Sequence, residues 1–124
     1  MLHEVTQRFF FDAAHTLRRE IETQSSQRIH GHTYCAEVAV AGTPDPTRCM
    51  VVDLGLLRAR IAVLREKLDH HFLDEVDGLT HPTLEGLCHF IAQQLDLSGL
   101  PGKLTRVRVW REQLGDGCTI TLPT

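Results

Sequence analysis

The chain of 124 residues is long enough for one ordinary hydrophobic core and too short for two domains of typical size. Its 13 Lys and Arg against 16 Asp and Glu give a net charge of −3, and only 6% of the residues are aromatic, so a nucleic-acid-binding surface is not expected. The sequence contains no apolar run of about 18 residues and no signal-peptide pattern, so we expect a cytoplasmic protein that does not span a membrane.

The first half of the chain predicts two strands joined by a loop. Residues 3–12 alternate between apolar and polar side chains, with Phe9 and Phe11 on one face. The polar stretch 13–28 has no clear period and is expected to be a loop. Residues 31–41 alternate again, and one face of this second strand carries Tyr34, Ala36, Val38 and Val40.

The second half predicts two helices and then two strands. Asp53 is a suitable N-cap for a helix that ends near Asp69, and its apolar stripe is Leu57, Ile61, Leu64 and Leu68. Thr83 caps a second helix, residues 104–111 alternate as a strand, and Gly115-Asp116-Gly117 turns into a last strand. The order ββααββ predicts an α+β fold in which two helices cover one face of a four-stranded antiparallel sheet. Such a sheet has two free edges, which favour a homo-oligomer.

Cysteine and histidine lead to opposite expectations for a metal site. The four cysteines are widely spaced without a CxxC pair, so we expect small buried side chains and no thiolate zinc site. The eight histidines are many for so short a chain, and His30 and His32 would point to the same side of a strand. If His15, just past the first strand, joins them, three imidazoles would leave one zinc coordination position open, as in catalytic sites. The alternative is that His30 and His32 are two ordinary histidines near a turn.

Two further features could carry acid–base chemistry or recognition. Asp69 beside His70 could orient the imidazole and raise its basicity, or both could simply lie at a helix C-terminus that favours histidine. Glu112 ends the third predicted strand and could accept two hydrogen bonds from an amidine-like edge, or it could be a solvated strand end.

Six motifs along nearly the whole chain resemble one known family. They are FDAAH, HGHTY, VVDLGLL, LDHHFLDE, HPTLEGL and RVWRE, in that order. The chain is similar to the 6-pyruvoyltetrahydropterin synthase family, and in particular to its bacterial 6-carboxytetrahydropterin synthases. The resemblance implies that residues 1–124 form a single tunnelling-fold domain, which assembles as trimers stacked into hexamers with active sites between subunits.

The resemblance also implies a reaction and a role for each site residue. The family's carboxy branch is a group of zinc lyases that remove triphosphate and acetaldehyde from 7,8-dihydroneopterin triphosphate, giving 6-carboxy-5,6,7,8-tetrahydropterin for queuosine synthesis. The matching motifs imply that His15, His30 and His32 bind zinc. They also imply that Asp69 and His70 form the proton relay. Glu112 matches the carboxylate that anchors the pterin ring, and Thr83 and Glu85 match a segment expected near the pterin pocket. Arg28 matches no family motif; it is a candidate for binding the triphosphate, and the alternative is a solvated surface side chain.

One position departs from the family pattern. In the synthases, a cysteine four residues before the first histidine of HGH acts as a base. That position here is Ser26. A hydroxyl is not ionised near neutral pH unless a partner assists it. Two alternatives therefore stay open: a pterin side-chain lyase with altered chemistry, or a pterin- and zinc-binding protein without turnover.

Overall fold

The computed structural model describes residues 1–16 and 30–123, and His30 is described by its backbone alone. The described chain forms four strands, two α-helices and one short 3₁₀ helix. Their bounds are β1 His3–His15, β2 His30–Gly42, α2 Leu54–Glu66, η1 Leu73–Glu75, α3 Leu84–Gln94, β3 Lys103–Arg111 and β4 Asp116–Thr121.

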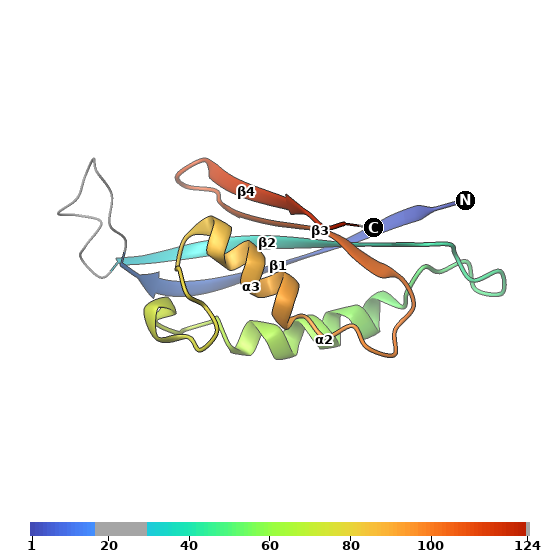
Figure 1. Ribbon diagram of the computed structural model, residues 1–124, viewed down its shortest axis with the longest axis horizontal. Coiled ribbons are helices and arrows are strands. Elements are labelled where there is room, and N and C mark those ends of the chain that lie inside the picture. Colours follow the sequence, from blue (N-terminus) through green and yellow to red (C-terminus); the bar gives the residue numbers. More distant parts are fainter. Residues whose placement is uncertain (17–29, 124) are drawn as a thin grey trace.

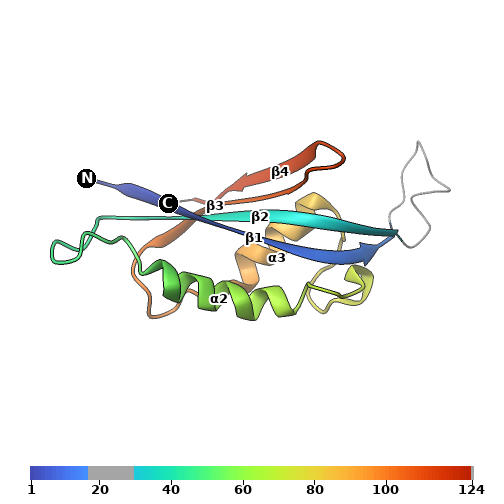
Figure 2. The same ribbon diagram turned by 180° about the vertical axis from the view of Figure 1, so that it is seen from behind.

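The strands form one antiparallel sheet in the order β1-β2-β3-β4, so β1 and β4 are its edges. Both α-helices lie on the same face of this sheet (Figures 1 and 2). Helix α2 contacts β1, whereas α3 contacts β3 and β4. The predicted arrangement of two helices over four antiparallel strands is therefore what the structure contains.

The core lies between the helices and the sheet, and the predicted periodicities supply it. The predicted apolar face of β2 is buried, as are Val107 and Val109 of β3. The predicted stripe of α2 is buried along its length: Leu57, Ile61, Leu64 and Leu68. Alternation in the strands and the helical period in α2 thus meet in one apolar layer.

Strand β1 is longer than the sequence predicts, so the predicted loop over 13–28 is wrong at its start. In the β1–β2 ladder, Ala13 pairs with His32 and His15 pairs with His30. Ala13 and His15 are buried, but neither is a large apolar residue, so the alternation is hard to recognise there. The ladder therefore extends to the histidines, and residues 17–29 lie outside the described part of the chain.

Helix α2 ends three residues before Asp69, earlier than predicted, and a turn follows it. His70 in this turn has a φ of 59°, in the left-handed region that a non-glycine residue adopts uncommonly. Its backbone N–H donates to the carbonyl of Asp12 at 2.7 Å. The chain then forms an isolated parallel bridge between Phe72 and Ala14, which holds this turn against the end of β1.

The cysteines fit their predicted role only in part. Cys88 is buried, Cys35 and Cys118 are half-buried, and Cys49 is exposed. The expectation of a buried side chain is therefore wrong for Cys49, which lies in the turn after β2 with a φ of 56°. Among the described residues, no helix is long and apolar enough to cross a membrane.

Both predicted helix caps are present, and the cap of α2 allows a stability test. A side-chain oxygen of Asp53 accepts a hydrogen bond from the Gly55 N–H at 2.8 Å. We expect Asp53→Ala to lower the free energy of unfolding by about 1 kcal/mol, because this N–H loses its partner. Chemical denaturation measures the change. Glu66→Ala, at the exposed C-terminal end of the same helix, is the control and should not destabilise the protein. Equal losses in the two variants would contradict a specific capping role.

Candidate functional site

His15 and His32 lie side by side at one end of the helix-covered face of the sheet. His15 ends β1 and is 1% exposed, and His32 is half-buried on β2. Their ring centroids are 5.0 Å apart, with the rings inclined at 67°. The buried ring of Tyr34 contacts both, with centroid separations of 6.0 Å from His15 and 5.8 Å from His32. Two imidazoles from different strands thus pack against each other and against the Tyr34 ring.

A long-range hydrogen bond defines the tautomer of His15. Its Nδ1 lies 3.0 Å from the carbonyl oxygen of Pro82, in the segment before α3. Because a carbonyl can only accept, Nδ1 carries the proton, and in the neutral ring Nε2 then carries the lone pair. A ring N–H donated to a backbone carbonyl is the usual outer contact of a metal-binding histidine. The donor chemistry at His15 and His32 therefore fits zinc.

The side chains of three predicted site residues lie outside the part of the chain that the structure describes. His30 pairs with His15 in the β1–β2 ladder, so its backbone lies beside the first histidine. Its side chain lies outside what the structure describes, as do Ser26 and Arg28 entirely. Two of the three predicted zinc ligands are therefore brought together, and the third is placed only by its register.

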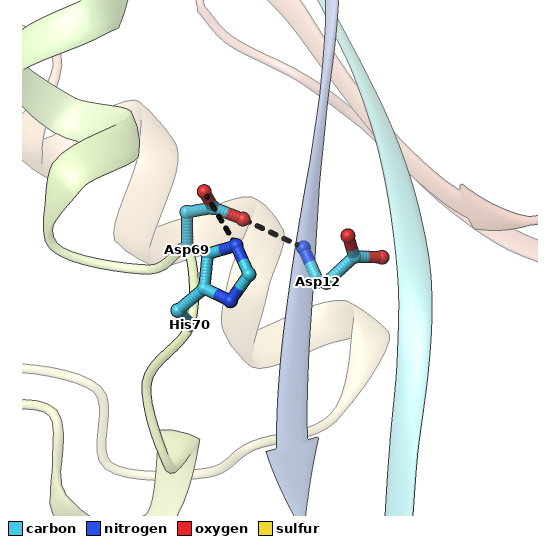
Figure 3. Close-up of side chains that lie close together, drawn as sticks. All are labelled: Asp12, Asp69 and His70. Carbon is cyan, nitrogen blue, oxygen red and sulfur yellow. Dashed lines mark hydrogen bonds and ion pairs between the residues drawn. The ribbon is translucent and has the colours of Figure 1, made fainter.

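Asp69 and His70 form a second group, attached to β1 (Figure 3). One carboxylate oxygen of Asp69 accepts from the backbone N–H of Asp12 at 2.9 Å. The other oxygen lies 3.2 Å from the Arg65 guanidinium and 3.5 Å from Nε2 of His70. The His70 side chain is 80% exposed, so its ring is accessible to a ligand or to water. The pair can therefore hold and exchange a proton at the surface.

The side chains of Asp12, Asp69 and His70 also form a group in which one ligand atom from each residue lies within 4.8 Å of the others. Such a group could hold a cation. However, an Asp12 oxygen accepts from the Thr33 hydroxyl at 2.5 Å, and both Asp69 oxygens have the contacts described above. These contacts make proton handling the simpler role for this group, and they leave the imidazole pair as the better zinc site.

An open cavity of about 550 Å³ connects the two groups. His32 contributes to its wall from the sheet, and His70 and His71 contribute from the turn after α2. Gln113 lines it from the turn after β3. A ligand in this cavity could thus contact His32 of the first group and His70 of the second at the same time.

The remaining predicted substrate-binding residues have other surroundings. Glu112 is exposed, and one of its oxygens accepts from the Trp110 indole N–H at 2.7 Å. Thr83 caps α3 through a hydrogen bond from the Gly86 N–H at 3.0 Å, and Glu85 is exposed in the first turn of the same helix. Within one chain, none of the three lines the cavity with His32, although Gln113 beside Glu112 does.

Arg111 is a buried charge that interacts with Tyr34 and that the sequence analysis did not single out. It is 5% exposed, and Asp116 accepts two hydrogen bonds from its guanidinium, at 2.9 and 2.6 Å. Burial lowers the pKa of Arg111, but the bonds and charge of Asp116, with a smaller contribution from Tyr34, outweigh it and leave the pKa raised. The alternation of Val107, Val109 and Arg111 could have placed it on the inward face.

Comparisons with known sequences match one family throughout. The model of the family described as 6-pyruvoyl tetrahydropterin synthase matches residues 4–122. A Synechocystis protein named 6-carboxy-5,6,7,8-tetrahydropterin synthase is 33% identical over 99 residues, which cover 76% of this chain and 75% of that protein. A Pyrococcus furiosus protein named dihydroneopterin monophosphate aldolase is 30% identical over 112 residues, covering 89% and 90% of the two chains.

A solved structure gives the same fold. The 6-pyruvoyl tetrahydropterin synthase of Caenorhabditis elegans superposes with a TM-score of 0.82 at 23% identity, covering 99% of this chain and 97% of that one. This similarity, together with the observed sheet and helices, confirms the predicted tunnelling fold.

Proposed function

Because the chain belongs to the 6-pyruvoyl tetrahydropterin synthase family, we propose that it is a zinc-dependent lyase that converts 7,8-dihydroneopterin triphosphate to 6-carboxy-5,6,7,8-tetrahydropterin. The relative named for this product is one third identical over three quarters of both chains. In this proposal, residues 1–124 act as one catalytic domain in the cytoplasm and supply the queuosine pathway.

The observation that carries the proposal is the contact between the His15 and His32 rings, with Nδ1 of His15 donating to Pro82. Zinc would be held by His15 and His32 together with His30, which is adjacent to His15 in the ladder. When bound, the metal acts as a Lewis acid that makes the hydroxyls of the substrate side chain more acidic. The protein supplies neutral imidazole donors and a wall from which bulk water is partly excluded.

Asp69 and His70 act as the proton relay in this scheme. The Asp69 carboxylate, fixed by the Asp12 N–H and by Arg65, lies 3.5 Å from Nε2 of the neighbouring imidazole and orients it. His70 can then accept a proton from the bound substrate and return it to another atom of the product. The shared cavity wall of His32 and His70 supports their action on one ligand.

Substrate binding requires more than one chain in this proposal. Glu112, Thr83 and Glu85 do not line the cavity of their own chain, and we assign them to a pterin pocket completed by a neighbouring subunit. The free edges of the sheet, β1 and β4, are suited to pairing between subunits, in keeping with a hexamer built from two trimers. Arg28 is assigned to the triphosphate.

A second candidate function is cleavage of the side chain of a related pterin. It is favoured by the relative named dihydroneopterin monophosphate aldolase, whose similarity covers more of both chains than that of the Synechocystis protein. Ser26 in place of the expected cysteine also favours altered chemistry, because a hydroxyl is a weaker proton acceptor than a thiolate. The zinc site and the Asp69–His70 pair serve both candidates.

The test is turnover by the purified, zinc-loaded protein, followed by mass spectrometry. Given dihydroneopterin triphosphate, it should release acetaldehyde and form a carboxypterin. A different pterin fragment, or turnover of the monophosphate alone, would replace this function by the second candidate. Binding without any product from either substrate would contradict both and indicate a binding protein.

Ser26 offers a test of the catalytic base. We expect Ser26→Cys to raise kcat about tenfold or more, because a few per cent of a free thiol is already thiolate near neutral pH. Steady-state kinetics at constant zinc content measure the change. Ser26→Ala is the comparison, and it should lower activity if the hydroxyl takes part. Unchanged kcat in both variants would show that residue 26 is not at the base position.

A further inference from the structure

The Pro82 carbonyl that binds His15 belongs to a segment that lies unusually close to the first turn of α3. A Cβ atom built on Gly86 would be 1.9 Å from the carbonyl oxygen of His81 and 3.3 Å from the hydroxyl oxygen of Thr83. Real Cβ atoms essentially never come within 3.0 Å of another atom, and a backbone carbonyl cannot rotate away as a side chain does. Only glycine therefore fits here without a shift of residues 81–83.

The same glycine also holds this segment in place. Its N–H donates to the Thr83 hydroxyl at 3.0 Å, and the next N–H, of Leu87, donates to the Thr83 carbonyl at 2.9 Å. Leu87 is fully buried, so the turn that makes these bonds is anchored in the core. The position of the Pro82 carbonyl is thus tied to α3 by close packing and by two hydrogen bonds.

We propose that Gly86 is a positioning residue for His15, acting through the Pro82 carbonyl. By letting residues 81–83 approach α3, it keeps that carbonyl 3.0 Å from Nδ1 and so fixes both the orientation of the ring and its tautomer. Nε2 then carries the lone pair that a zinc ligand needs. The inference rests on the proposed zinc role of His15, whereas the hydrogen bond itself does not depend on metal.

The first measurement uses the metal-free protein. Long-range ¹H–¹⁵N NMR spectra distinguish the two neutral tautomers, and wild-type His15 should have its proton on Nδ1. In Gly86→Ala the added methyl group displaces the Pro82 carbonyl, so the Nε2–H tautomer should become populated. An unchanged Nδ1–H tautomer in a folded Gly86→Ala protein would overturn the proposal.

The second measurement is zinc affinity, by competition with a chromophoric chelator. Gly86→Ala should bind zinc about 10–100-fold more weakly, the usual cost of losing an outer contact of a metal ligand. Gly99→Ala is the matched control, because it makes the same chemical change where the added Cβ has no heavy atom within 4 Å apart from those of Gly99 and its chain neighbours. Gly99→Ala should keep the wild-type zinc affinity, whatever its stability. A loss of stability is expected because the φ of Gly99 is 79°, a backbone conformation that residues with a side chain rarely adopt. Equal affinities of Gly86→Ala and wild type would overturn the proposal.

Thr83→Ala provides the same test if Gly86→Ala does not fold. It removes the hydroxyl that holds the segment without introducing an overlap. Zinc affinity should fall in Thr83→Ala and be restored in Thr83→Ser, and wild-type affinity in Thr83→Ala would count against the proposal. If the wild-type protein itself binds no zinc, the proposed function fails, while the tautomer of His15 still decides whether Gly86 positions the ring.

Discussion

His32→Ala is expected to bind zinc at least about 100-fold more weakly, because losing a ligand should cost more than losing an outer contact. Activity measured at limiting zinc should fall by about 10³-fold or more, since the metal supplies several kcal/mol of charge stabilisation. His32 is only half-buried, so the folded state should persist. Metal analysis after dialysis, steady-state kinetics and circular dichroism measure the three effects.

The control for this loss is His89→Ala, which removes an exposed histidine from α3. It should retain full zinc content and activity. His30→Ala should behave like His32→Ala, which would extend the ligand set to the residue placed only by its register. Full zinc occupancy in His32→Ala would remove it from the set of ligands.

Asp69→Asn is expected to lower kcat by about 10²–10⁴-fold without changing zinc content. The amide keeps the shape of the side chain but loses the negative charge that lies beside the His70 imidazole, and general acid–base catalysis typically contributes this factor. His70→Ala should lose a similar factor, and the double variant should lose little more, because the two residues act as a unit. Rapid-quench or steady-state kinetics at saturating substrate give the values.

Asp77→Asn is the matched carboxylate control for that experiment, since Asp77 is exposed in the turn after η1. It should leave kcat unchanged. If Asp69→Asn lost zinc together with activity, the Asp12–Asp69–His70 group would have to be reconsidered as the metal site. If it kept full activity, the proton relay would lie elsewhere.

The sheet and the two helices could be predicted from the sequence because their signals are local. Alternation in β2 and the apolar stripe of α2 each follow from side-chain spacing within one element. The caps Asp53 and Thr83 were predictable for the same reason, since a cap contacts residues two or three positions ahead. The end of β1 was not predictable, because Ala13 and His15 are buried without an apolar pattern that distinguishes them.

The contacts that define the site are long-range, and for this reason the sequence did not reveal them. His15 and Pro82 are separated by 67 positions, and Asp12 and Asp69 by 57. Each contact depends on how α2, α3 and the segments that flank them meet the end of β1. The bond between Trp110 and Glu112 is close in sequence, but the sequence does not show which of the possible partners Glu112 takes.

The most direct test of the account is an anomalous difference map, recorded at the zinc absorption edge from crystals grown with zinc. We predict one strong peak per chain, about 2.0–2.1 Å from Nε2 of both His15 and His32, with Nδ1 of His15 still bonded to the Pro82 carbonyl. A peak at Asp12, Asp69 and His70 instead, or none near His15 at saturating zinc, would contradict it.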